Sequence, residues 1–334
     1  MKGEADLLEK LFLGLGVGLL FGFVLQRGRF CMYTAFRDML LIKDFTLVKA
    51  YLLALLIQMV LVHLLIRWGM VSPGASPFLW LGAITGGFIF GIGMTLAGGC
   101  SSSSFYRVGE GMVGSFVAVL TFIIFAAVTR NGVLRPLAIT LYSYNMDMGV
   151  HSATLSHILG INNWYIVTVL VLGGGFWLFS DRSPKPVRGW GWRKTGITIG
   201  LIAALAWWTS AMTGRHYGLS ITGPSASVLL YLTSANKGYL DWGTFQVIGI
   251  PLGAFIAASW NKEFRWRAPQ PRRMMQQALG GALMGTEAVI AGGCNIGNSL
   301  TGLGILSLTS FVATVFLILG TWSGTYLFFL RQRR

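Results

Sequence analysis

The chain has three cysteines, and two of them stand in the same tetrapeptide. Ala-Gly-Gly-Cys occupies residues 97–100 and again residues 291–294, so Cys100 and Cys294 lie 194 residues apart (294 − 100). The third, Cys31, follows Gln-Arg-Gly-Arg-Phe. A thiol is a weak hydrogen-bond donor with a polarisable sulfur, and its thiolate is a nucleophile and a soft metal ligand. These residue types indicate three candidate chemistries: contact with a sulfur-containing anion, persulfide formation, or Cu(I) binding.

Each tetrapeptide places two glycines at the end of an apolar run. Two glycines weaken a helix by ~1 kcal/mol each relative to alanine. In lipid, the freed backbone groups are tolerated only inside protein or along a cavity. Good N-cap residues follow, Ser101 to Ser104 in one copy and Asn295 in the other. We therefore expect a helix to end at each motif and a half-helix to begin inside the membrane, with N–H groups and a dipole end that favour an anion.

An anion-binding helix start beside a thiol suits a sulfur-bearing anion, so we predict a path along Cys31, Cys100 and Cys294. Cys31 has no cysteine twin, because the corresponding glycine-rich stretch at 217–224 carries Thr222. The path is therefore expected to be asymmetric, with its extra thiol toward the cytoplasm. We predict no catalytic residue, metal ion or cofactor, and the residues expected to position the anion are Gly99, Ser101, Gly293, Asn295, Arg29 and Thr222.

Three alternatives for the repeated tetrapeptide stay open. Small residues also let helices pack closely, although packing requires neither the cysteine nor the serines. Three thiolates would suit Cu(I), although the 13 methionines form no pattern near the cysteines. A Cys100–Cys294 disulfide is conceivable if the two motifs meet, but it would block the path.

Glu287 is an acidic residue inside an apolar run, seven residues before Cys294. Intramembrane acids are candidates for function, so Glu287 is a possible proton relay or charge partner. A structural hydrogen bond explains it equally well. Its counterpart in the other copy is Gly93, so this acid is not part of the repeat. His63, alone in its apolar run, is expected to make a structural hydrogen bond.

Composition identifies the class of protein. The 334 residues are 54% hydrophobic and 11% charged, with a mean hydropathy of +0.65, whereas soluble domains are about 25% charged. About nine runs approach the ~20 residues needed to cross a bilayer, so we predict an all-α polytopic membrane protein. The net charge of +15 comes from short basic segments beside these runs, which positive-inside topology explains; nucleic-acid binding is not expected. The acidic start of the chain is unlike a signal peptide.

The tetrapeptides belong to a longer repeat. Residues 86–100 match residues 280–294 at seven of fifteen positions, which indicates a duplicated unit. We divide the chain into a first half (1–130), a linker with a central span and a basic loop (131–194), and a second half (195–334). The expected spans are 11–26, 47–66, 79–98, 112–128, 164–179, 195–212, 242–260, 276–292 and 308–330.

Four spans, one linking span and four more invert the second half relative to the first, as in many transporters. The basic segments at 181–194, 261–273 and 331–334 should be cytoplasmic. The N-terminus and a long polar connection at 130–161, with Asp147 and His151, should then lie outside. Re-entrant half-helices should meet at the middle of the membrane, with Cys100 and Cys294 facing each other there.

Three motifs together resemble the YeeE/YedE sulfur-transport family over nearly the whole chain. They are the stretch from Gln26 to Cys31 with the following Ala-Phe-Arg-Asp at 35–38, the two Ala-Gly-Gly-Cys tetrapeptides, and the stretch at 217–225. The resemblance implies a bacterial inner-membrane permease that takes up thiosulfate. It also implies an hourglass-shaped inverted repeat in which thiosulfate passes between the thiols of Cys31, Cys100 and Cys294 through S–H···S and S–H···O contacts, without covalent chemistry.

The same resemblance keeps neighbouring functions open. Some members of the family are associated with selenium metabolism, and many are linked to a small cytoplasmic sulfur-carrier protein, which is a possible partner here. The rival from another class is a membrane sulfurtransferase that forms a cysteine persulfide, because basic residues near Cys31 would favour its thiolate. A third alternative is a structural membrane subunit that transports nothing alone.

Overall fold

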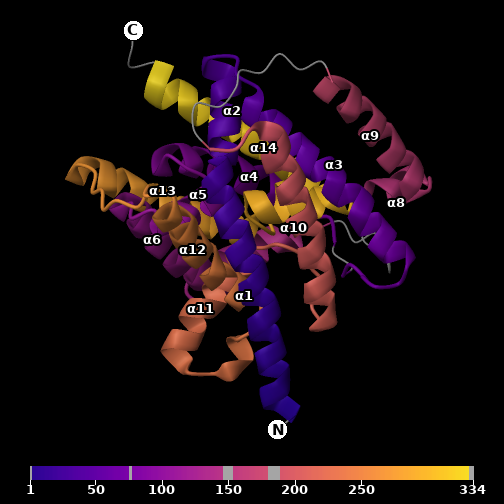
Figure 1. Cartoon of the computed structure of the whole chain (residues 1–334), viewed down its shortest axis with the longest axis horizontal. Helices are drawn as coiled ribbons and strands as arrows, with labels where there is room; N and C mark the ends of the chain where they lie inside the picture. Colours follow the sequence, from indigo (N-terminus) through magenta and orange to yellow (C-terminus); the bar gives the residue numbers. More distant parts are fainter. Residues whose placement is uncertain (1, 75–76, 146–152, 180–188, 331–334) are drawn as a thin grey trace.

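The computed structural model describes residues 2–74, 77–145, 153–179 and 189–330, and within these the chain is almost entirely helical (Figure 1). The β-pairing among the described residues consists of two isolated bridges, Met112 with Arg267 and Thr154 with Ser307. Asp147 and His151, residues 181–188 of the basic loop, and the tail at 331–334 lie outside the described residues. The prediction of an all-α membrane protein is confirmed.

Each expected span coincides with a helix. Seven helical stretches of the described chain are long and apolar enough to cross a membrane; α9, with 17 residues, is shorter than these, and α13 is not among the seven. The count of nine spans therefore stays a prediction. The nine helices are α1 (Lys2–Gly28), α3 (Thr46–Arg67), α4 (Trp80–Ala97), α6 (Val113–Asn131), α9 (Asn163–Phe179), α10 (Trp192–Met212), α12 (Trp242–Trp260), α13 (Pro271–Ile290) and α14 (Leu308–Thr325).

Short helices begin after the interruptions in these long ones. They are α2 (Met32–Leu41), α5 (Ser101–Gly109), α11 (Thr222–Ser234) and the π-helical segment η2 (Gly297–Gly302). Short 3-10 and π segments, η1 (Lys237–Tyr239) and η3 (Tyr326–Leu330), also occur. A short helical segment thus follows each glycine motif, as the sequence predicts.

The connection at 130–161 is not simply polar, which corrects the sequence prediction. It contains α7 (Arg135–Ser143) and α8 (Leu155–Leu159). Pro136 sits in the first turn of α7, where its missing N–H costs no hydrogen bond. Ala138 is buried with alanines of α6 and with Val289 and Ile290. One apolar face over a few turns buries the segment, and the polar residues around it obscured that face in the sequence.

The helices pack in equivalent pairs. At the 194-residue offset, α1 corresponds to α10, α3 to α12, α4 to α13 and α6 to α14. The closest packing joins α1 to α12 and, equivalently, α10 to α3; it also joins α4 to α14 and, equivalently, α13 to α6. Glycines allow these approaches, since a Cβ on Gly18 would lie 2.9 Å from the Cα of Gly249.

The central pair of equivalent helices runs in opposite directions. A Cβ on Gly86 of α4 would lie 3.0 Å from the Glu287 carbonyl of α13, and one on Gly93 would lie 3.2 Å from the Gly280 carbonyl. Higher numbers on α4 thus meet lower numbers on α13. Antiparallel packing of duplicated helices is what an inverted repeat requires, so this geometry supports that prediction.

Candidate functional site

Both tetrapeptides break the helix in the same way. Gly98 follows the end of α4 with a φ of 72°, and Gly292 follows the end of α13 with a φ of 74°. This left-handed conformation favours glycine. Helical structure resumes at Ser101 and at Asn295. The predicted sequence of break, turn and half-helix is therefore present in both halves.

The cysteines, rather than the serines, occupy the helix starts, which corrects the sequence prediction. Cys100 is the N-cap of α5 and Cys31 is the N-cap of α2, both with extended backbone. Cys294 directly precedes the helical residue Asn295. The Cys294 carbonyl accepts from the Asn298 N–H at 2.8 Å, and the other two cysteine carbonyls accept equivalent bonds at 2.9 Å. All three thiols thus stand at the N-terminus of a half-helix.

Cys31 and Cys100 form a thiol pair. Their sulfurs are 3.9 Å apart, and Cys31 Sγ also donates to Ser103 Oγ at 3.2 Å. Cys100 Sγ lies 3.3 Å from Ser102 Oγ. These side chains are buried, and all three cysteines of the chain are free. The Cys100–Cys294 disulfide considered above is not formed, and the sulfur that neighbours Cys100 is that of Cys31.

The two motifs meet through residues at equivalent positions. Ser101 Oγ donates to Asn295 Oδ1 at 2.7 Å, and these residues are 194 apart. Asn295 Nδ2 in turn donates to Met32 Sδ at 3.2 Å. Met32 is the first residue of α2, so all three cysteine-capped helix starts converge on one hydrogen-bonded centre. The predicted meeting of re-entrant elements is present, although Ser101 and Asn295 make the contact.

Arg107 is a candidate that the sequence analysis missed. It lies seven residues after Cys100 on α5, which is about two helical turns. Its Nη1 donates to the Gly98 carbonyl at 2.8 Å, and a Cβ on Gly99 would lie 3.0 Å from the same nitrogen. The spacing of two turns after a cysteine was the available signal.

The second motif opens onto a cationic cavity of about 510 Å³. Arg130 of α6, Arg135 of α7 and Arg215 before α11 line it. Arg215 Nη1 and Thr222 Oγ1 are buried without a protein hydrogen-bond partner. Burial lowers the pKa of the Arg215 guanidinium, which reflects the cost of a buried cation. Unpaired donors beside three arginines favour an anion, and the lining also includes Tyr217, Thr222, Gly292 and Gly293.

Tyr217 links this cavity to the second motif. Its hydroxyl donates to the Gly297 carbonyl at 2.7 Å, and the residue lines the cavity. Asn298 Nδ2 donates to the Gly293 carbonyl at 2.7 Å, which holds the turn after α13 in place. The cavity wall and the third thiol therefore belong to one connected site.

The remaining predicted residues are placed as follows. Arg29 pairs with Glu263 at 3.2 Å and its side chain is 46% exposed, whereas the thiol pair is buried. Glu287 is 8% exposed, and no ion pair is found for it in the described part of the chain. His63 Nδ1 lies 2.9 Å from the Met59 carbonyl, as expected of a structural histidine.

Comparison with known proteins adds independent findings. The family described as Sulphur transport matches residues 27–323. A protein named thiosulfate transporter TsuA from Escherichia coli is 38% identical over 96% of this chain and 95% of its own length. A protein of the same name from Spirochaeta thermophila is 38% identical over 96% of this chain and its full length. The probable transporter YedE of E. coli is 34% identical over 31% of this chain and 25% of its own length.

Proposed function

The chain belongs to the sulphur-transport family, and from this premise we propose that it takes up thiosulfate across the bacterial inner membrane. It is a multi-pass membrane transporter and not an enzyme. The observation that carries the proposal is the pairing of an arginine-lined cavity at one helix break with a buried thiol pair at the other.

Capture begins in the cavity at the second motif. Thiosulfate is a dianion with three hard oxygens and one soft terminal sulfur. Guanidinium groups bind such oxygens strongly, because charge-assisted hydrogen bonds are about twice as strong as neutral ones. Arg215 and Thr222 have buried donor atoms without a protein partner, so an anion here would satisfy groups that are otherwise costly to bury. Cys294 follows at the inner end of this cavity wall.

Transfer then proceeds along the thiols. Cys294, Cys100 and Cys31 are at most 1% exposed, so an anion reaching them loses its water and needs replacement donors. The S–H groups, the hydroxyls of Ser102 and Ser103, and the half-helix N–H groups supply these donors. The terminal sulfur of thiosulfate meets sulfur at each step. No covalent bond is formed or broken in this scheme.

Topology assigns a direction to the path. With the N-terminus outside and the C-terminus cytoplasmic, α7 and its cavity face outward. The thiol pair and Arg107 then lie toward the cytoplasm, where a small sulfur-carrier protein would receive the transported thiosulfate. This scheme also rests on the inverted repeat and on the division into residues 1–130, 131–194 and 195–334. Topology reporters fused at residues 5, 145 and 332 test it. A reversed orientation would exchange the two sides, and an even number of spans would place residues 5 and 332 on the same side of the membrane.

Uptake of radiolabelled thiosulfate into proteoliposomes tests the function. The intact chain should accumulate label, whereas Cys100→Ala and Cys294→Ala should reduce uptake to the rate of empty vesicles. Normal uptake by either variant would refute the thiol path. Intact-mass measurement after exposure to thiosulfate separates transport from sulfurtransferase chemistry. An added sulfur atom on a cysteine would contradict the non-covalent scheme.

A further inference from the structure

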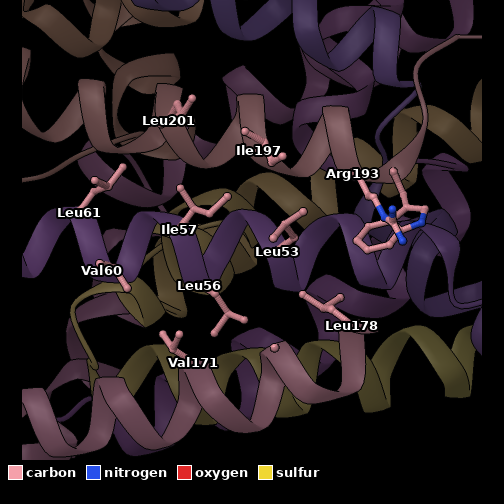
Figure 2. A pocket seen from close by; sticks show the side chains of 12 residues that line it. Leu53, Leu56, Ile57, Val60, Leu61, Val171, Leu178, Arg193, Ile197 and Leu201 are labelled. Atoms are coloured by element: carbon pink, nitrogen blue, oxygen red, sulfur yellow. The ribbon is translucent and has the colours of Figure 1, made fainter. Parts of the chain in front are cut away.

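An apolar hollow lies apart from the candidate site, because none of the three cysteines is among the residues that line it. Its volume is about 740 Å³, and α3, α9 and α10 line it. Figure 2 shows side chains from these three helices around it, with α3 between the other two and Arg193 at one end. α9 stands at the side of the bundle (Figure 1) and packs against α3. Apart from Arg193, the residues that line the hollow are mostly apolar, including Leu53, Ile57, Leu61, Val171, Leu178 and Leu201.

One end of the hollow is cationic and aromatic. Three tryptophans near this end each lie close to a cation: Lys49 Nζ is 5.6 Å from the Trp177 ring, the Arg193 guanidinium is 5.3 Å from the Trp192 ring, and Lys194 Nζ is 4.1 Å from the Trp190 ring. Tryptophan and basic residues concentrate at the headgroup level of a bilayer. This end therefore marks the membrane–water interface.

The length of the hollow matches one leaflet. Arg193 and Leu201 both line it and are eight residues apart on α10 (201 − 193), which corresponds to ~12 Å at the rise of an α-helix. Half of the hydrocarbon core of a bilayer is ~15 Å thick. The groove thus runs from the interface to about the middle of the membrane.

We propose that this groove binds one phospholipid with an anionic headgroup, its phosphate at Arg193 and an acyl chain along α3 between α9 and α10. Charge selects the occupant, because Arg193 lines the hollow and is exposed, as is the next residue, Lys194, and basic pockets between membrane helices on the cytoplasmic side bind anionic headgroups. The acyl chain fills space that α9 leaves open beside the bundle. The bound lipid would then hold α9 in place against α3.

Two glycines of α9 provide a matched pair for the test. Gly175 lines the hollow, and a Cβ there would meet nothing within 4 Å. Gly175→Phe should therefore fill the groove without displacing protein atoms. A Cβ on Gly173 would also meet nothing within 4 Å, but Gly173 is not among the groove-lining residues. Gly173→Phe is the control for adding a ring to the same helix.

Native mass spectrometry of the purified full chain tests the proposal, with dioleoylphosphatidylglycerol and dioleoylphosphatidylcholine supplied in equal amounts. We expect one phosphatidylglycerol retained per chain, in preference to phosphatidylcholine. Arg193→Gln should lower that retention several-fold and abolish the preference. Gly175→Phe should abolish retention of either lipid, and Gly173→Phe should behave as the unmodified chain.

Three outcomes would overturn the proposal. Equal retention of the two lipids by the unmodified chain would exclude charge selection. Full retention by Gly175→Phe would place the lipid elsewhere. A lipid-free dimer broken by Gly175→Phe would show that a second copy of the chain covers the groove. Thiosulfate uptake by each variant verifies that it has folded, independently of lipid binding.

Discussion

The two Ala-Gly-Gly-Cys motifs share a backbone and differ in what surrounds them. Gly98 and Gly292 have φ values of 72° and 74°, and each cysteine precedes a new helix. Around Cys100, however, the space is filled by Cys31, Ser102 and Ser103, whereas the motif of Cys294 borders an arginine-lined cavity of about 510 Å³. Duplication thus supplied the same helix break twice, and the side chains around the two copies differ; in the proposed scheme one set captures the anion and the other passes it between thiols.

The largest expected effect comes from removing the charge of Arg215 from the cavity beside the second motif. Arg215→Gln should weaken thiosulfate binding by about 10- to 100-fold, since a hydrogen bond to a charged group contributes ~1.5–3 kcal/mol. Isothermal titration calorimetry on the purified chain measures this. Arg67→Gln is the matched control, because Arg67 does not line this cavity. Equal losses in both variants would indicate a general charge effect and no specific site.

The next effect compares the two turns directly. Alanine in a left-handed conformation costs roughly 1–2 kcal/mol, so Gly98→Ala and Gly292→Ala should both lower the unfolding temperature. Gly98→Ala should lower it slightly more, because the end of the flexible Arg273 side chain must shift away from the new Cβ, whereas the nearest atom to a Cβ on Gly292 is Leu79 Cδ1 at 3.8 Å. Thermal unfolding in detergent measures both. The reverse order would mean that the first motif is not the more tightly enclosed one.

A smaller effect tests whether the two motifs are joined. The Ser101–Asn295 hydrogen bond should contribute ~1 kcal/mol. A double-mutant cycle with Ser101→Ala and Asn295→Ala isolates that coupling from the other losses. Additive losses would show that the two half-helices do not support each other at this point.

The smallest effect concerns Glu287, the buried acid on α13 that has no counterpart on α4. If Glu287 relays protons, Glu287→Gln should leave uptake unchanged when no pH gradient is imposed. The same variant should lose any stimulation of uptake by an inward proton gradient. Proteoliposomes with and without an imposed gradient provide the comparison. Persistent stimulation in the variant would assign Glu287 a structural role.

Local features of the chain were predictable from the sequence. The apolar runs located the long helices to within a few residues at most ends, because length and hydropathy determine a span. The glycine pairs located both breaks, since few other residues adopt the left-handed turn at Gly98 and Gly292. The fixed offset of 194 residues also indicated which helices are equivalent, and α4 and α13 do lie antiparallel.

Contacts between distant segments were not predictable in the same way. Cys31 and Cys100 are 69 residues apart in the chain, and packing of α2 against the centre brings them together. The arginines of the cavity come from three separate segments, one of which, α7, lies in the connection that the sequence predicts to be polar. For Arg29, proximity to Cys31 in the sequence predicts a role beside the thiols, and that role stays a prediction; in the structure its side chain pairs with Glu263.

The proposal assigns capture of the anion to the second motif and its transfer to the thiol pair at the first. The most direct test compares thiosulfate binding with thiosulfate uptake in Cys31→Ser. This change keeps a donor at the helix start and removes one sulfur of the thiol pair. Calorimetry should give the affinity of the unmodified chain for thiosulfate, because the cavity at the second motif is untouched, while proteoliposome uptake should fall sharply. Loss of binding together with uptake, or normal uptake, would contradict the assignment of capture to one motif and transfer to the other.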